Sequence, residues 1–131
     1  MRSIGFLVLA GALGGCAQPP PPSEVCTLIG CESGLTVVVE PAPSGDYAVR
    51  AETADSARTV QCTALQRCAE GAFFADFTPQ RATVHVIAGG DTTVQSVTPS
   101  YETLQPNGPT CPPTCRRATV TVRRTGGDAD R

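Results

Sequence analysis

The sequence predicts an all-β protein, an antiparallel β-sandwich with disulfides. Three observations support this prediction. Short runs rich in valine and threonine, residues that favour strands, alternate apolar with polar positions. Glycines and prolines, 13 and 12 of the 131 residues, separate these runs. Of the seven cysteines, all but Cys16 lie among the expected strands, and the chain has no tryptophan and one methionine, so a modest apolar core calls for covalent support.

The chain begins with a short apolar leader. Arg2 precedes the apolar run of residues 4–13, which is too short for a permanent membrane-spanning helix. The Leu-Gly-Gly-Cys motif at 13–16 resembles the lipobox of bacterial lipoproteins. This resemblance implies that residues 1–15 are a cleaved signal peptide and that Cys16 is lipidated with two or three acyl chains such as palmitate, enough for stable anchoring. An ordinary secretory signal, with Cys16 an odd thiol, is the alternative.

Residues 16–25 are expected to form a Pro-rich tether. The four prolines at 19–22 favour polyproline II, which suits a spacer between lipid and domain. A ligand for a proline-recognition module is the alternative. In some lipoprotein families Asp after the lipidated cysteine retains the protein in the inner membrane, so Ala17 favours the outer membrane in a host that has one. The expected location is therefore the cell envelope, with the lipid bilayer as partner through Cys16.

The β-sandwich domain is expected at residues 26–124. Its first strands are predicted at 35–40 and 47–52, joined by turn residues at 43–46. A third is predicted at 58–65, although a helix over 52–70 competes with it. The residues expected to face inward on these strands are Leu35, Val37, Val39, Tyr47, Val49, Ala51, Val60, Cys62 and Ala64.

The second half of the domain continues the alternation. A strand over 82–86 and a hairpin turn at 89–91 lead into a strand over 92–98, where the phase of Val94 and Val97 predicts a bulge or bend. The last strand is predicted at 118–123. The expected inward residues are Ala82, Val84, Val86, Ala118, Val120 and Val122. Residues 125–131 are predicted to be a disordered tail.

The six domain cysteines are the disulfide candidates: Cys26, Cys31, Cys62, Cys68, Cys111 and Cys115. Six cysteines allow fifteen pairings, and spacing supplies only a bias. Cys62 and Cys68 are close enough to form a local loop. The other four fall into an N-terminal and a C-terminal pair, and joining one pair to the other closes nearly the whole domain, which stabilises it more. Separate local bridges within each terminal pair are the alternative.

Two chemical alternatives concern the same cysteines. Cys111 and Cys115 could be a redox pair, but they have three intervening residues in a proline-rich loop, whereas the thioredoxin-like motif has two beside a helix. A zinc site is disfavoured because His85, the only histidine, lies in a different segment. The sequence therefore predicts structural bridges, no metal and no cofactor.

Charge and catalytic motifs point away from several function classes. The net charge of −2 does not suggest nucleic acid as a partner. Arg116, Arg117, Arg123 and Arg124 form the only basic cluster, which is interpreted as a solvated strand edge. His85 is expected to point outward without a base partner, so no catalytic residue is predicted. Calcium binding is conceivable if four turn aspartates gather at one end of the sandwich: Asp46, Asp55, Asp76 and Asp91.

A second resemblance covers most of the domain. Pro99-Ser100-Tyr101, the Pro-Asn-Gly-Pro segment at 106–109 and the cysteines that follow are similar to the ending of an uncharacterised group of small Cys-rich predicted lipoproteins from GC-rich soil bacteria. The resemblance implies a β-sandwich and no activity. Immunoglobulin-like and transthyretin-like sandwiches are similar at the level of fold only.

We therefore expect a membrane-anchored envelope lipoprotein of unknown specific role, a non-enzymatic interaction or structural module with a possible envelope protein as partner. The alternative is a periplasmic accessory enzyme or thiol redox factor that uses Cys111 and Cys115.

Overall fold

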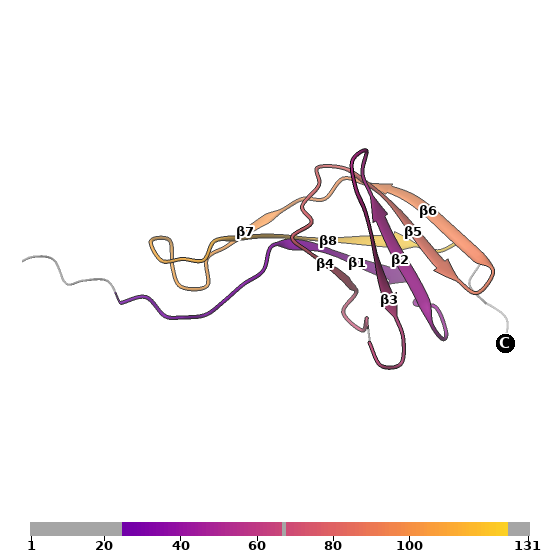
Figure 1. The fold of residues 1–131 in the computed structure, drawn as a ribbon, viewed down its shortest axis with the longest axis horizontal. Coiled ribbons are helices and arrows are strands. Elements are labelled where there is room, and N and C mark those ends of the chain that lie inside the picture. Colours follow the sequence, from indigo (N-terminus) through magenta and orange to yellow (C-terminus); the bar gives the residue numbers. More distant parts are fainter. Residues whose placement is uncertain (1–24, 67, 126–131) are drawn as a thin grey trace, which may run out of the picture.

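The computed structural model describes residues 25–66 and 68–125, and these residues form two four-stranded sheets with no helix among them (Figure 1). The first sheet has the strand order β4 (Ala72–Ala75), β1 (Gly34–Glu40), β8 (Cys115–Arg123) and β7 (Glu102–Leu104). The second has the order β3 (Ala57–Cys62), β2 (Tyr47–Glu52), β5 (Ala82–Ala88) and β6 (Asp91–Val97). The predicted all-β sandwich with disulfides is confirmed.

One strand pairing departs from the antiparallel expectation. β1 and β8 run parallel, with Leu35 opposite Ala118 and Val39 opposite Val122, whereas all other pairings of the described strands are antiparallel. A parallel pair needs a long crossover, and here nearly the whole domain lies between the two strands. The strand order also differs from that of an immunoglobulin constant domain, in which the first two strands share a sheet; here β1 and β2 lie in different sheets.

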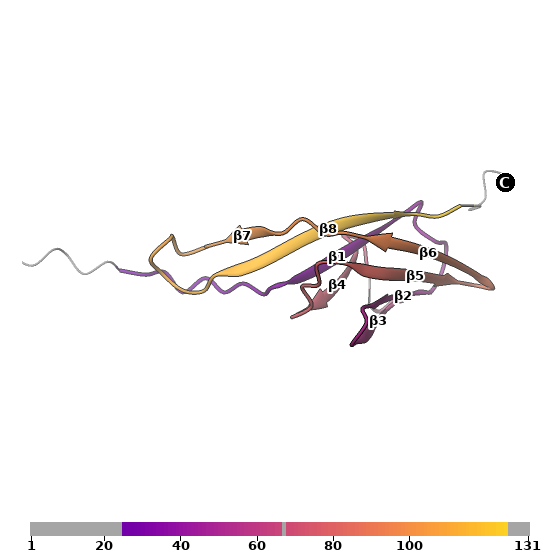
Figure 2. The same ribbon diagram turned by 90° about the horizontal axis from the view of Figure 1, so that it is seen from above.

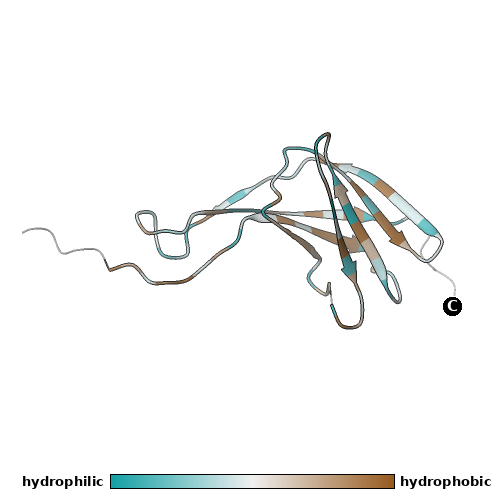
Figure 3. Ribbon diagram, in the orientation of Figure 1, coloured by the Kyte–Doolittle hydropathy of each residue, from teal (hydrophilic) through white to brown (hydrophobic). Residues whose placement is uncertain are grey.

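The core lies between the two sheets and consists mainly of small apolar side chains. Among the predicted inward residues, those buried are Leu35, Val37, Val39, Val49, Ala51, Cys62, Ala82, Val84, Val86, Ala118 and Val122. Tyr47, Val60 and Val120 pack against this core while partly exposed. Apolar colour accordingly alternates along the strands in Figure 3. Among the described residues no polar or charged side chain is buried in the core, so burial of valine-sized groups supplies most of the sandwich's stability.

Two phenylalanines that the sequence analysis did not place fill one end of this core. Phe74 on β4 and Phe77 after it are buried, with ring centroids 5.9 Å apart. Gly34 allows β1 to lie close to β4, because a Cβ at this position would meet the Phe74 carbonyl oxygen and lie 2.7 Å from the Phe73 ring. Glycine is therefore required here for close packing of the two strands.

Several strand predictions are corrected. β6 pairs with β5 residue by residue from Asp91 to Val97, so the predicted bulge is absent and Val94 points outward. The third strand ends at Cys62, and Ala64 lies in an exposed turn. The competing helix over 52–70 is not formed by the described residues of that stretch. β4 and β7 were not predicted, because strands of four and three residues are too short to show alternation.

The chain extends beyond the sandwich at one end. Residues 25–33 and 105–114, here called the arm, run side by side away from the sheets in both views (Figures 1 and 2). The predicted signal peptide, Cys16 and nearly all of the tether lie outside the described residues, as does most of the predicted tail. In the described part of the chain, no helix has the length and apolar character needed to cross a membrane.

Candidate functional site

Two disulfides hold the arm together, one within it and one at its base, where β8 begins. Cys26 bonds to Cys111 and Cys31 bonds to Cys115, with Cα atoms 5.6 and 6.1 Å apart. The third bridge, Cys62 to Cys68, closes the local loop after β3. The predicted end-to-end clasp is therefore present, and the alternative of separate local bridges within each terminal pair is not.

Asn107 replaces the backbone hydrogen bonds that a regular strand pair would make in the arm. Its Oδ1 accepts from the Ile29 N–H (3.0 Å) and from the Thr27 hydroxyl, and its Nδ2 donates to the carbonyl oxygens of Ile29 (2.8 Å) and Pro112 (2.7 Å). One amide side chain thereby satisfies both backbone groups of Ile29, in a segment where Pro112 and other prolines cannot donate. The sequence analysis quoted Asn107 only within a resemblance and did not assign it this position.

Cys111 and Cys115 are buried and belong to different disulfides. They are therefore not a redox pair with each other, and any redox role would require two separate bridges to open first. Reactive cysteines lie in accessible, electropositive surroundings. The geometry at these two sulfur atoms is that of structural bridges.

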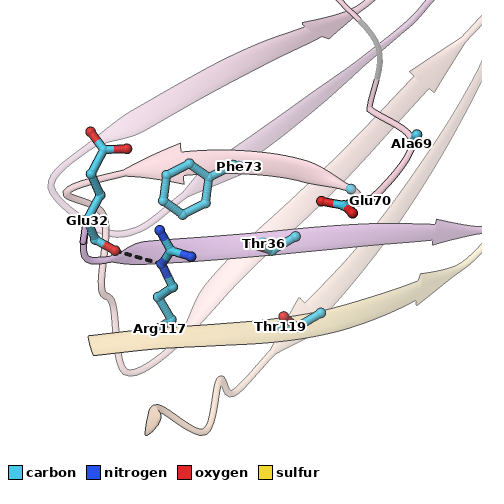
Figure 4. A pocket seen from close by; sticks show the side chains of 8 residues that line it. Glu32, Thr36, Ala69, Glu70, Phe73, Arg117 and Thr119 are labelled. Carbon is cyan, nitrogen blue, oxygen red and sulfur yellow. Dashed lines mark hydrogen bonds between the residues drawn. The ribbon is translucent and has the colours of Figure 1, made fainter. Parts of the chain in front are cut away.

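One hollow among the described residues lies on the outer face of the first sheet. It is shallow and open, with a volume of about 660 Å³. Figure 4 shows the labelled side chains around it, which come from β1, β4, β8, the loop before β4 and, for Glu32, the segment before β1. The lining residues are Glu32, Thr36, Ala69, Glu70, Gly71, Phe73, Arg117 and Thr119.

Arg117 is the side chain in this hollow that could bind a ligand through several hydrogen-bond donors. Its Nε donates to the Glu32 carbonyl oxygen (2.8 Å), and its guanidinium lies 5.3 Å from the centroid of the Phe73 ring (Figure 4). No described residue accepts a hydrogen bond from its two Nη atoms, so these can face a polar ligand. The carboxylates of Glu32 and Glu70 line the same hollow and oppose the binding of a strongly anionic one. The hollow therefore suits weak binding of a polar ligand that carries little negative charge.

His85 points outward, as the alternation predicts, and lies on the flat outer face of the second sheet. Glu52, which the sequence analysis did not connect with it, has Oε1 3.4 Å from His85 Nε2 and Oε2 3.1 Å from the Arg50 guanidinium. The His85 Nε2 atom is buried and forms no hydrogen bond with the described residues, so its contact with Glu52 is close but poorly aligned. Val94 lies opposite His85 on β6. Glu52 and His85 are in contact, but Val94, the residue opposite His85 on β6, has no nucleophilic group.

The four turn aspartates do not gather at one end. Asp46 and Asp91 lie at the end of the second sheet where Tyr47 pairs with Ala88. Asp55 and Asp76 line a different hollow at the opposite end. Within residues 25–66 and 68–125, no three His, Cys, Asp or Glu side chains are grouped as metal ligands would be. The calcium hypothesis therefore has no site among these aspartates.

The four arginines of the predicted basic cluster are also separated. Arg116 and Arg117 lie at the start of β8 and Arg123 at its end. The Arg116 guanidinium lies 4.9 Å from the Tyr101 ring centroid, and Arg123 Nη1 lies 3.5 Å from Glu40 Oε2. β8 is not a free edge over its first residues, because β1 and β7 flank it there. The interpretation of a basic strand edge is therefore wrong for Arg116 and Arg117, where β7 pairs with β8, whereas Arg123 lies beyond the residues that pair with β7.

Two tyrosines are the described groups with shifted ionisation. Burial raises the pKa of Tyr47 and of Tyr101, and in Tyr101 the positive charge of Arg116 lowers the pKa by a smaller amount. The Tyr101 hydroxyl donates to the Pro79 carbonyl oxygen (2.8 Å), which ties the segment before β7 to the loop after β4. Both tyrosines are neutral at physiological pH, and their place against the core indicates a packing role.

No family model, curated protein or solved structure matches this chain.

Proposed function

We propose that this protein is a lipid-anchored component of the bacterial cell envelope, located at the outer membrane in a host that has one. Its sandwich acts as a non-enzymatic interaction or structural module. The support for the anchor is the apolar leader and the lipobox motif that ends at Cys16. The three disulfides agree with an oxidising compartment outside the cytoplasm.

The observation that carries the proposal is the way in which the N-terminal segment joins the domain. A chain anchored at Cys16 transmits any pull through Val25 to Cys26 and Cys31. Both cysteines are bonded to the segment that leads into β8. The force is therefore shared between Cys111 and Cys115. Because both bridges are covalent, the force does not break the hydrogen bonds between β1 and β8 one after another. Such a joint suits a module that must stay folded while it is held at its N-terminal end.

The non-enzymatic part of the proposal rests on the distribution of reactive side chains. Glu52 and His85 lie on a flat strand face, while Arg117 lies in a hollow of the other sheet. Active sites bring acid, base and binding groups into one concave site. The described residues offer a polar hollow at Arg117 and an exposed arm, which are features of contact surfaces. The thiol redox alternative has less support, because Cys111 and Cys115 are not bonded to each other.

The test is metabolic labelling with a clickable fatty acid, followed by separation of the membrane fractions. The wild-type protein is expected to carry the label and to sediment with the membrane. A Cys16→Ser variant is expected to lose both properties, because the chain has no other expected acylation site. Ala17→Ser, which leaves the lipobox intact, is the matched control and should behave as wild type. Label that persists in Cys16→Ser would refute the anchor.

A further inference from the structure

The arm carries apolar side chains that are largely exposed. Leu28 is 99% exposed, Val25 is 90% exposed and Ile29 is 56% exposed. Figure 3 shows this stretch in apolar colours well away from the sandwich core. Exposed apolar groups gathered on one projection of a folded chain mark a contact surface.

The arm is also free of charge. Residues 25–31 and 105–114 contain no Asp, Glu, Lys, Arg or His, although 22 of the 131 residues of the chain are acidic or basic. Charged side chains begin again at the base of the arm, with Glu32 on one strand and Arg116 and Arg117 after the other. The charged residues of the described chain therefore lie in the sandwich and at the base of the arm, and the rest of the arm is uncharged.

Exposure alone does not distinguish this surface, as Leu65 demonstrates. Leu65 is 100% exposed in the Cys62–Cys68 loop. It is the only large apolar residue between Cys62 and Cys68, with Gln66 next to it and Arg67 two residues after it. Single exposed apolar residues of this kind are normal on a protein surface. The arm differs because its three apolar residues lie within five positions of one another; none of residues 25–31 is charged, and the nearest charges in the sequence are Glu24 and Glu32.

Part of the arm's backbone is hydrogen-bonded within the arm, at Ile29 and at Cys111. Asn107 satisfies the N–H and the C=O of Ile29, and Cys111 N–H donates to the Gly108 carbonyl oxygen (3.3 Å). Backbone groups that leave water need such partners. The two disulfides hold the strands together without an apolar core between them. The arm thus keeps its form while its apolar side chains point outward.

The attachment of the chain identifies what covers these side chains. On the proposed function, Cys16 is held in the membrane surface, and nine residue steps separate it from Val25. A fully extended chain spans at most about 3.6 Å per residue, so Val25 lies within roughly 32 Å of the anchor. The anchored chain therefore enters the domain through the arm, so the apolar residues of the arm are within reach of the lipid surface.

From these observations we infer that the arm is a membrane-contact element: Val25, Leu28 and Ile29 insert into the headgroup and upper acyl region of the bilayer that holds Cys16. Apolar side chains of interfacial segments reach about 5 to 10 Å into this region. The inference rests on the proposed function and extends it. The arm gives the anchored domain a fixed orientation on the lipid surface.

The absence of tryptophan makes the test direct, because a Leu28→Trp variant has a single indole reporter. Acylated Leu28→Trp protein is purified from envelopes and reconstituted into phosphatidylcholine vesicles, with or without lipid brominated near the headgroup end of the chains. Brominated lipid is expected to reduce the emission about twofold, and iodide in the buffer is expected to have little effect. Leu65→Trp is the matched control, which should respond to iodide and not to bromine.

Each outcome decides the inference. Emission from Leu28→Trp that iodide quenches as strongly as that from Leu65→Trp would overturn it, and so would protection from iodide without quenching by bromine, which places the arm against protein. Val25→Trp provides a second reporter if Leu28→Trp fails to form its disulfides. Mass spectrometry of the peptide that contains Cys16 measures independently whether this cysteine is acylated. An acylated protein with an iodide-accessible arm refutes only this inference, whereas a protein without acyl chains refutes the proposed function and the inference together.

Discussion

The sandwich and the arm are stabilised in opposite ways. The sandwich buries Leu35, Val37, Val84 and similar side chains between two sheets, and none of its described polar or charged residues is buried as a whole. The arm buries almost no apolar side chain; two disulfides and the amide of Asn107 hold it. A two-stranded element is marginal in water by itself. The comparison teaches that covalent bonds here substitute for a core where the chain leaves the domain.

The two arm bridges also depend on each other. They join residues 85 and 84 positions apart, so each closes almost the same loop around the whole sandwich. The first to form removes the entropy of that long loop from the unfolded chain, a gain of about 4 to 5 kcal/mol on the chain-entropy estimate. The second closes only the small ring between the two bridges, a gain of roughly 2 to 3 kcal/mol.

The largest effect is expected from removing both arm bridges. Replacing all four cysteines of the arm by serine should lower the free energy of unfolding by more than about 5 kcal/mol, enough to unfold much of the protein at physiological temperature. Urea unfolding followed by far-UV circular dichroism measures this loss. A midpoint within error of wild type would show that the arm contributes nothing to the sandwich.

Removing one of the two arm bridges tests whether both bridges close the same long loop. A Cys26→Ser, Cys111→Ser variant should lose only about 2 to 3 kcal/mol, because Cys31–Cys115 still closes the long loop. A Cys62→Ser, Cys68→Ser variant, which opens a loop with a separation of six, should lose a similar amount. A single-bridge loss that equals the loss of both bridges would refute the nested arrangement. The same urea titration compares the three variants.

The next effect is expected in the sandwich core. Leu35 on β1 is fully buried, so Leu35→Ala should lower the free energy of unfolding by about 3 kcal/mol through lost burial and a residual cavity. Leu65→Ala makes the same chemical change at a fully exposed site and should alter stability by less than about 0.5 kcal/mol. Thermal unfolding of both variants provides the measurement. Equal losses would contradict the division between core and surface leucines.

The smallest effect is expected at Asn107 and should stay local to the arm. Asn107→Ala leaves both backbone groups of Ile29 without a protein partner, at a cost of about 1 to 2 kcal/mol in opening of the arm. Amide hydrogen exchange at Ile29 should accelerate while exchange at Val37 stays unchanged. Asn107→Asp keeps the acceptor and loses the donor, so it should give an intermediate rate. A uniform acceleration in both regions would indicate global destabilisation instead.

The strands that could be predicted are those in which alternation continues for several residues. β1, β2 and β5 show a clear period of two, and their inward residues are buried. β4 and β7 are too short for that signal, and their formation depends on pairing with β1 and β8. Val94 misled the prediction because an apolar residue on the outer face imitates a change of phase. The grouping of cysteines predicted the clasp, because loop entropy favours joining distant segments.

Alternation and cysteine spacing are local properties of the chain, so the sequence alone was enough to predict the all-β class, the inward face of most strands and the pairing bias of the cysteines. Only the tertiary structure decided that β1 and β8 run parallel, that Glu52 lies beside His85, that Arg117 stacks near Phe73 and that Asn107 spans the two strands of the arm. These pairs are separated by 33 to 83 residues in the chain, and sequence carries no local signal for contacts that arise when distant segments pack together.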